Sequence, residues 1–191
     1  MGEFQLERDI IKRYIENRLK RKLENDQKDL RILSEGDLQS CVYYHLRVLI
    51  RKKKLSKLWY LTNKLAMGKQ RKDKMFPDIV IMRKKDAGRV KPIFLIELKE
   101  HESYHPKSVK DDLEKLKHAS RRWHDVVQTY FILAAPDENL DSKKIIEKME
   151  TVRNKIKVEK VFLISVNVFH KLKGPEPGKW KDKYKRLKKL R

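Results

Sequence analysis

The chain is poor in cysteine, glycine, proline and long apolar runs. Its 191 residues include one cysteine, Cys41, with six glycines and six prolines. A single cysteine excludes a disulfide framework within the chain and a cysteine-based zinc site. No run of about 18 apolar residues is present, so the sequence predicts no membrane span. The N-terminus lacks the apolar segment of a secretory signal. We therefore expect an intracellular, cytoplasmic protein (in the host cytoplasm if the source is a virus).

Acidic residues are scarce relative to basic ones. The chain has 49 Lys and Arg against 27 Asp and Glu, a formal net charge of +22. This excess favours a polyanionic partner, because lysines near phosphates release condensed counterions. A solubilising surface or the lysine enrichment of thermophilic proteins would give a similar composition. Nucleic acid is the partner that we expect, and a site is needed to support it.

The apolar residues, 39% of the chain, suffice for one core and come in patterned blocks. Their spacing predicts helices over 3–26, from 34 to the basic run 51–54, over 106–122 and over 142–154, and strands over 58–66, 77–83, 92–99, 128–135 and 161–169. This order predicts an α/β three-layer fold with a mixed central sheet. We divide the chain into an N-terminal helical extension (1–33), a core (34–170) and a basic C-terminal tail (171–191).

Two strands that are apolar on both faces carry charged residues near their ends. Asp78 stands at the start of one strand, and Glu97 and Lys99 stand at the end of the other. Side chains of a strand alternate between its faces, so Glu97 and Lys99 share a face. Charges on buried strands are costly unless they are paired or bound to a metal.

The turn between these strands supports a register in which Asp78 lies opposite Glu97. The same register pairs Asp86 with Arg89 and leaves Ala87-Gly88 as a two-residue turn. Asp78 then lies on the face of Glu97 and Lys99. The rest of that face is predicted to consist of Val80, Met82, Ile93 and Leu95.

Carboxylates that meet in this way suit Mg²⁺ or Mn²⁺, with waters and a substrate phosphate as further ligands. The backbone carbonyl of Leu98 is a natural additional ligand. Lys99 could orient or deprotonate the attacking water, or stabilise the charge that develops on phosphorus.

A third carboxylate can be placed by helical geometry. Glu35 precedes Leu38 by three residues and Val42 by seven, so it lies on the core-facing stripe of its helix, whereas Asp37 points elsewhere. Glu35 could therefore reach the metal. A role as a first-turn acid that complements the helix dipole stays open for Glu35.

The segment Pro77 to Ile81, followed by a strand that ends in Glu97-Leu98-Lys99, resembles the PD-(D/E)xK nuclease superfamily. Residues 34–39 resemble its first core helix, and residues 109–122 resemble the helix after the motif strand. The resemblance implies a restriction-endonuclease-like αβββαβ core over residues 34–135 and Mg²⁺-dependent hydrolysis of phosphodiesters. Members include Holliday-junction resolvases, restriction enzymes, repair nucleases and nucleases of viruses and mobile elements.

These features predict a metal-dependent nuclease, with DNA favoured over RNA as the substrate. The predicted catalytic residues are Glu35, Asp78, Glu97 and Lys99, and the predicted metal ligands are Asp78, Glu97, Leu98 and Glu35. Phosphate contacts are predicted for Lys52, Lys53, Lys54, Lys69, Arg71, Lys72, Lys179, Lys181, Lys185 and Arg186. Two alternatives stay open, a non-catalytic nucleic-acid-binding protein on a nuclease-like fold and a metal-dependent endoribonuclease. A homodimer would suit the cutting of both strands.

Overall fold

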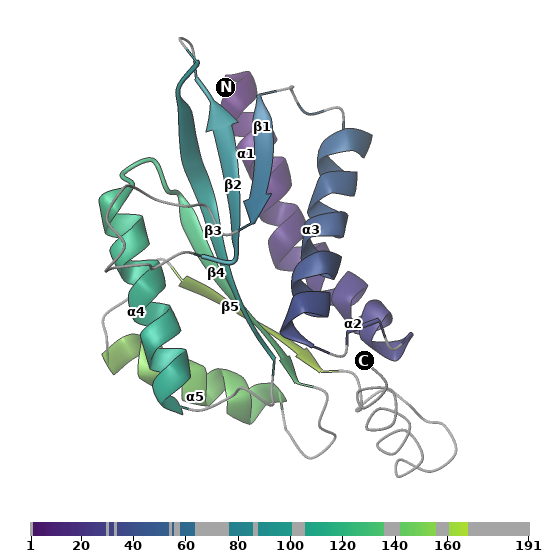
Figure 1. Ribbon diagram of the computed structural model, residues 1–191, viewed down its shortest axis with the longest axis vertical. Coiled ribbons are helices and arrows are strands. Elements are labelled where there is room, and N and C mark those ends of the chain that lie inside the picture. The colour runs from purple at the N-terminus through teal and green to yellow at the C-terminus, as the bar shows by residue number, and fades with distance from the viewer. Residues whose placement is uncertain are drawn as a thin grey trace.

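The fold is a five-stranded sheet between two layers of helices (Figure 1). The computed structural model describes residues 2–29, 31–32, 34–53, 55, 58–63, 77–85, 88–100, 106–135, 142–155 and 161–167. The predicted order of helices and strands and the three-layer α/β architecture are confirmed. Within the described residues, no helix has both the length and the apolar character needed to cross a membrane.

The sheet is mixed, with its strands in chain order from one edge to the other. Strands β1 (Trp59–Asn63), β2 (Ile79–Lys84) and β3 (Val90–Glu100) form an antiparallel meander. Strands β4 (Gln128–Ala135) and β5 (Val161–Asn167) continue the sheet in parallel with β3. The change from antiparallel to parallel pairing therefore occurs at β3, which lies at the centre.

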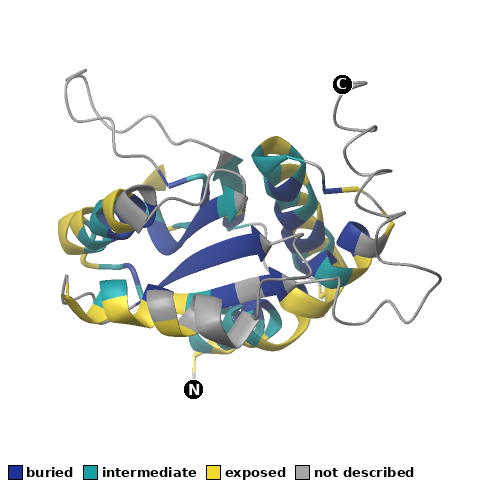
Figure 2. Cartoon of the chain, turned by 90° about the horizontal axis from the view of Figure 1, so that it is seen from below, coloured by how far each residue is buried: buried dark blue, intermediate teal, exposed yellow. Residues whose placement is uncertain are grey.

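Each face of the sheet is covered by its own helices (Figures 1 and 2). One layer contains α3 (Glu35–Lys52) and an N-terminal run made of α1 (Glu3–Tyr14), the π-helical turn η1 (Ile15–Leu19) and α2 (Lys20–Lys28). The other layer contains α4 (Pro106–Arg122) and α5 (Ser142–Lys155). Figure 2 shows the buried strands between helices whose outer surfaces are exposed.

The N-terminal run packs into the main core of the molecule. Ile11, Ile15, Leu19 and Leu23 follow one another at intervals of four and are at most 1% exposed. They belong to the same apolar cluster as α3 and one face of the sheet. Burial of each such side chain contributes about 1.5–3 kcal/mol. Residues 3–28 are therefore integral to the packing of the sheet.

Helix α3 begins where the sequence predicts. Ser34 is its N-cap, and the Ser34 hydroxyl accepts a hydrogen bond from the backbone N–H of Asp37 at 3.2 Å. The predicted stripe of Leu38, Val42, Leu46 and Leu49 is buried. This packing fixes the rotation of the helix, and the rotation determines where Glu35 and Asp37 point.

The hairpin of β2 and β3 keeps the predicted register only at its open end. Ile79 pairs with Ile96, as predicted, but a bulge between Ile81 and Met82 shifts the pairing toward the turn. The carbonyl of Arg89 accepts a hydrogen bond from the backbone N–H of Lys85 at 2.7 Å, in place of the predicted pairing with Asp86, which lies outside the described residues. Three residues therefore separate the closing pair, and Gly88 adopts φ +77°, a left-handed conformation that glycine permits.

The bulge also moves one side chain to the other face of the sheet. Ile93 is the residue of β3 that the pairing skips between Pro92 and Phe94. It packs with the cluster on the α3 side, whereas Val80 and Leu95 pack with α4 and α5. The prediction that Ile93 shares a face with Leu95 is wrong, because an extra residue breaks the alternation.

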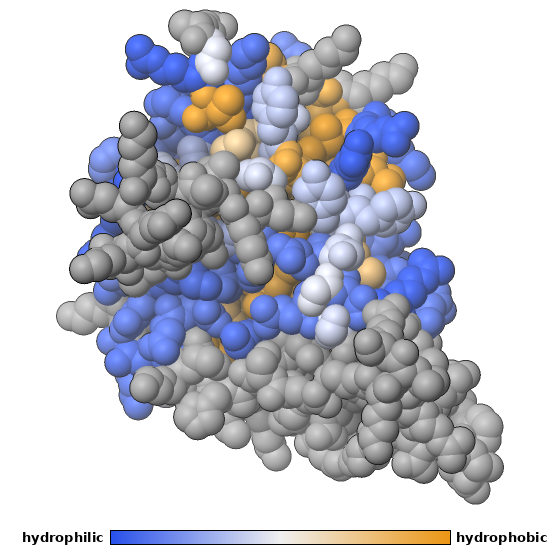
Figure 3. Space-filling model, viewed as in Figure 1, coloured by the Kyte–Doolittle hydropathy of each residue, from blue (hydrophilic) through white to orange (hydrophobic). Residues whose placement is uncertain are grey.

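The exposed surface is mainly hydrophilic on the face shown in Figure 3, and hydrophobic residues gather there along the sheet between the helix layers. The large hydrophobic side chains that are exposed lie on five different elements, at Leu6, Tyr44, Tyr60, Val90 and Phe162. Single exposed hydrophobic residues are normal in folded proteins.

Candidate active site

Strand β3 extends beyond the start of β2 and leaves an edge at the end of the sheet. Ile79, the first residue of β2, lies opposite Ile96, so Glu97 to Glu100 pair with β4 alone among the described strands. Side chains from α3 and α4 contact this end of the sheet. The residues that the sequence singled out meet here.

Asp78 caps the ladder between β2 and β3. Its carboxylate accepts a hydrogen bond from the backbone N–H of Leu98 at 2.8 Å, and its backbone carbonyl accepts one from the side chain of Gln39 at 2.9 Å. Burial raises the pKa of Asp78, and the bond from Leu98 opposes this only in part. Asp78 is thus a fixed carboxylate that lacks full solvation.

Glu97 is the most deeply buried acid of the site, with 3% exposure. One carboxylate oxygen, Oε1, accepts a hydrogen bond from Lys115 of α4. The other, Oε2, is buried without a hydrogen-bond partner among the residues that the structure describes. Burial, followed by the neighbouring charge of Asp78, raises the pKa of Glu97 well above its usual range.

Lys99 joins the two helix layers across the end of the sheet. Its Nζ lies 3.2 Å from Oδ2 of Asp112 on α4 and 4.0 Å from Oε2 of Glu35 on α3. Asp112 is also 3.1 Å from Lys115, which binds Glu97. Glu35, Lys99, Asp112, Lys115 and Glu97 therefore form one continuous chain of ion pairs.

Negative charge predominates in this cluster. Four acids, Glu35, Asp78, Glu97 and Asp112, meet two lysines, Lys99 and Lys115. Burial alone would lower the pKa of Lys115, but the charges and hydrogen bonds of Glu97 and Asp112 outweigh it, and the pKa is raised. Lys115 is thereby favoured as a cation, and the cluster contains more acids than lysines.

Structure and sequence agree on which of two neighbouring acids faces the site. Glu35 reaches Lys99, whereas the carboxylate of Asp37 accepts a hydrogen bond from the Ser34 hydroxyl at 3.0 Å. The prediction that Asp37 does not point in the direction of Glu35 is confirmed, because its carboxylate contacts Ser34.

Asp112 and Lys115 are site residues that the sequence reasoning missed. The signal was present in α4, because Asp112 lies three residues after Val109 and four before Leu116, both of which are buried. An acid on an apolar helix stripe needs a partner. That partner comes from β3, and only the tertiary fold reveals it.

The donors suit a hard divalent cation, although they do not converge on one point. Within the described residues, no group of three or more His, Cys, Asp or Glu side chains is arranged to hold a metal ion. The available donors are carboxylate oxygens, which Mg²⁺ and Mn²⁺ prefer, and the partnerless Oε2 of Glu97 is one of them. The residues therefore fit such a cation in their chemistry.

The predicted phosphate contacts fall mostly outside the described residues. Lys52 and Lys53 lie at the end of α3, about 27 Å along the helix from Glu35 at 1.5 Å per residue. The other predicted contacts, Lys54, Lys69, Arg71, Lys72, Lys179, Lys181, Lys185 and Arg186, are not among the residues that the structure describes.

Comparison of the chain with family models, with curated proteins and with solved structures finds no match to any of the three. The fold and the site are therefore interpreted from their own geometry.

Proposed function

We propose that the protein is a metal-dependent nuclease that hydrolyses phosphodiester bonds, with DNA as the favoured substrate and a site of the PD-(D/E)xK type. The observation that carries this proposal is the pairing of the buried Glu97 with the half-buried Asp78, with Lys99 beside them, at the end of β3. Burial raises the pKa of both acids, which means that their ionised forms are destabilised at this position. Perturbed carboxylates grouped in this way are typical of functional sites.

The order of the elements supports the finer fold assignment. Helix α3, strands β1 to β3, helix α4 and strand β4 follow one another as αβββαβ, the order of a restriction-endonuclease-like core. In this arrangement the acid that precedes β2 and the ExK residues of β3 lie at the same end of the sheet. The N-terminal run and the α5–β5 unit are additions to that core.

Mg²⁺ or Mn²⁺ would be held by the carboxylates of Asp78 and Glu97 and the carbonyl of Leu98, with support from Glu35. When bound, such an ion activates water as a nucleophile and neutralises charge on the phosphate. Oε2 of Glu97 is the donor that has no protein partner among the described residues. Its burial excludes competing bulk water.

Lys99 would position the attacking water or a phosphate oxygen. Asp112 and Glu35 hold its ammonium group between α3 and α4, so the N–H donors are oriented before the substrate arrives. Preorganised donors of this kind act without the cost of reorientation during the reaction. Hydrolysis then adds water to phosphorus and breaks the bond to the leaving oxygen.

A non-catalytic nucleic-acid-binding protein is the second candidate, and one contact favours it. Lys115 already neutralises one oxygen of Glu97, as a cation would in a site that has no need of a metal. In that case Glu97 and Lys115 would be a structural pair, and the raised pKa of Glu97 would reflect burial alone.

Cleavage of a panel of labelled DNA and RNA structures separates these possibilities. Junctions, duplexes, flaps and single strands are incubated with Mg²⁺, Mn²⁺ or EDTA. We expect cleavage of DNA with either metal and none with EDTA. Cleavage of RNA alone would favour the endoribonuclease, and binding without cleavage of any substrate would favour the non-catalytic protein.

A further inference from the structure

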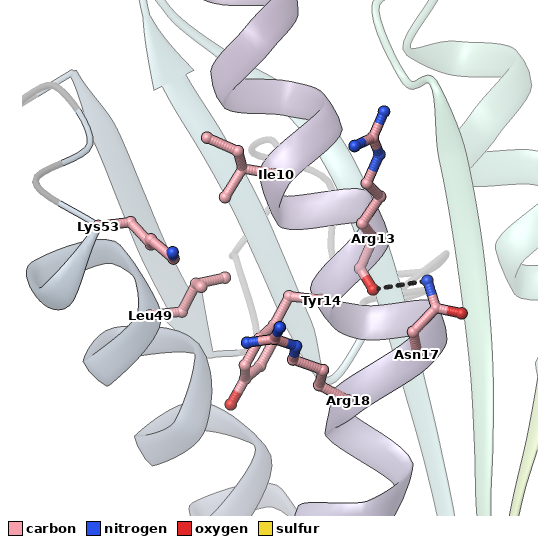
Figure 4. Close-up of a pocket in the computed structure, with 7 residues that line it drawn as sticks. All are labelled: Ile10, Arg13, Tyr14, Asn17, Arg18, Leu49 and Lys53. Carbon is pink, nitrogen blue, oxygen red and sulfur yellow. Dashed lines mark hydrogen bonds between the residues drawn. The ribbon is translucent and has the colours of Figure 1, made fainter.

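A groove lies between the N-terminal helical run and α3, away from the carboxylate cluster. It consists of two adjoining cavities of about 420 and 430 Å³, and Tyr14, Arg18, Leu49 and Lys53 line both. Figure 4 shows the side chain of Lys53 extending from the end of α3 toward the N-terminal run, and the guanidinium of Arg18 beside the Tyr14 ring. The shared residues make the two cavities one continuous groove.

Several exposed basic side chains of this groove form no ion pair with another described residue, and we single out four of them. Arg18 and Lys22 come from the N-terminal run, and Lys52 and Lys53 come from α3. All four are exposed, and none forms an ion pair with another described residue. We call these four residues the groove cations. Like charges placed together, such as Arg18 and Lys22 at i and i+4, destabilise a helix.

Asp26 and Asp29, the acids that line the groove, each have a partner at salt-bridge distance. Asp26 lies 2.5 Å from Nε2 of His45 and 3.3 Å from Arg31, and Asp29 lies 3.4 Å from Arg31. Neither acid forms an ion pair with a groove cation among the described residues. The positive charge at the groove therefore remains available to a ligand.

An exposed aromatic ring and a π-helical turn complete the groove. Tyr44 lines the second cavity, is 63% exposed and lies edge-to-face with His45 at 5.4 Å between ring centroids. Exposed aromatic rings beside cations are typical of surfaces on which bases or riboses stack. The turn at Ile15–Leu19, where Asn17 donates to the carbonyl of Arg13 at 3.1 Å, is of a kind that occurs frequently at functional sites.

We propose that this groove binds the sugar-phosphate backbone of a nucleic acid, with the groove cations on the phosphates and Tyr44 against a base or ribose. The proposal rests on the proposed function only for the choice of polyanion, since a nuclease must hold its substrate beyond the scissile bond. It gives the N-terminal run a binding role in addition to its place in the core.

The length of α3 determines how far a substrate must reach. Lys53 lies about 27 Å along the helix from Glu35, which corresponds to about eight base pairs at 3.4 Å per pair. A duplex that occupies both sites must therefore extend about eight base pairs beyond the cut. A shorter duplex should occupy only one of the two sites at a time.

Salt dependence of binding tests the groove directly. The full chain carrying Glu97→Gln is titrated in EDTA against labelled 20-mers, single-stranded and duplex, at several KCl concentrations by fluorescence anisotropy. The groove variant adds Arg18→Gln, Lys22→Gln and Lys53→Gln. The matched control adds Arg121→Gln, Arg122→Gln and Lys155→Gln, which remove three exposed charges from the opposite helix layer.

We expect the slope of log affinity against log salt to become shallower by about 2 to 3 for duplex in the groove variant, at about 0.9 per phosphate contact. The control should change it by less than about 0.9. A charge-preserving variant, Arg18→Lys with Lys22→Arg and Lys53→Arg, should retain wild-type binding. Circular dichroism confirms that each variant is folded.

Two outcomes would contradict the proposal that the groove binds nucleic acid. If the salt slope changes equally in the groove variant and in the control, nucleic acid is attracted by the overall positive charge of the protein and not by the groove. Loss of binding to phosphatidylserine vesicles, with nucleic-acid binding unchanged, would assign the groove to a lipid surface. If the groove variant shows the shallower salt slope but the protein cleaves no substrate, the nuclease proposal fails. The proposal that the groove binds nucleic acid is then still supported.

Discussion

Two clusters of buried charge lie on the two flanks of α3, and they differ in their balance. Between α2 and α3, Asp26 is in contact with His45 and Arg31. At the end of β3, four acids share two lysines, and Oε2 of Glu97 has no partner in the described part of the chain. In the first cluster each carboxylate oxygen of Asp26 has a partner, Oδ1 in Arg31 and Oδ2 in His45. In the second cluster acids outnumber lysines, an imbalance that a bound cation could relieve.

The largest expected effect is the loss of cleavage when the second cluster is altered. Asp78→Asn, Glu97→Gln and Lys99→Ala should each lower the cleavage rate by about 10³-fold or more. Double variants should lose little more than single ones, because each change disrupts the same assembly. Single-turnover rates with purified protein measure this. A variant near wild-type activity would remove its residue from the mechanism.

Alteration of the first cluster should affect stability and leave catalysis intact. His45→Leu leaves the buried carboxylate of Asp26 without its closest partner and should lower the free energy of unfolding by about 3 kcal/mol. Urea denaturation measures the loss. Asp26→Leu combined with His45→Leu should recover most of it, because an apolar pair removes the lone charge.

The cleavage rate of folded His45→Leu should match that of wild type. A fall in cleavage with full stability would show that the first cluster is itself functional, and the contrast between the clusters would not hold.

The strand pair that carries Asp78, Glu97 and Lys99 could be predicted from the sequence, because it depends on local patterns. The cluster of Asp26, His45 and Arg31 was not predicted. Helix α4 and strand β4 have the predicted bounds, since apolar spacing and flanking polar residues define both. Asp78, Glu97 and Lys99 were found because charge on apolar strands is unusual.

The incorrect or missing predictions concern features that depend on tertiary contacts or on a local irregularity of a strand. The bulge had a signal in Pro92, since proline in a central strand is confined to bulges and irregularities. The position of Asp112 on a buried helix stripe signals that it has a partner. The identity of that partner could not be predicted, because Asp112 and Lys115 contact Lys99 and Glu97 on β3.

The cluster at the end of β3 should also make stability depend on pH. In metal-free protein, the raised pKa of Glu97 means that its contribution to stability is fully present below the ordinary glutamate pKa of about 4.3 and is lost as pH rises through the raised value. The melting temperature of wild type should therefore fall relative to Glu97→Gln as pH rises from about 4.3. Mg²⁺ should reduce this difference, because it stabilises the ionised carboxylate. If the difference in melting temperature between wild type and Glu97→Gln does not change with pH, ionisation of Glu97 does not destabilise the fold.

The smallest effect separates two neighbouring acids of α3. Glu35→Gln should lower the cleavage rate or weaken its dependence on Mg²⁺, because Glu35 contacts Lys99. Asp37→Asn should cost only a few tenths of a kcal/mol through the helix dipole and leave cleavage unchanged. Equal activity of both variants would show that Glu35 acts only as a first-turn acid.

Binding of Mn²⁺ is the most direct test of the claim that the unbalanced cluster is a cation site. Calorimetric titration of wild type, Glu97→Gln and His45→Leu, without nucleic acid, compares the two clusters in one measurement. The account predicts that wild type and His45→Leu bind Mn²⁺ with similar Kd, and that Glu97→Gln binds at least about tenfold more weakly, the equivalent of 1.4 kcal/mol. No binding to folded wild type, or equal binding to Glu97→Gln, would contradict it.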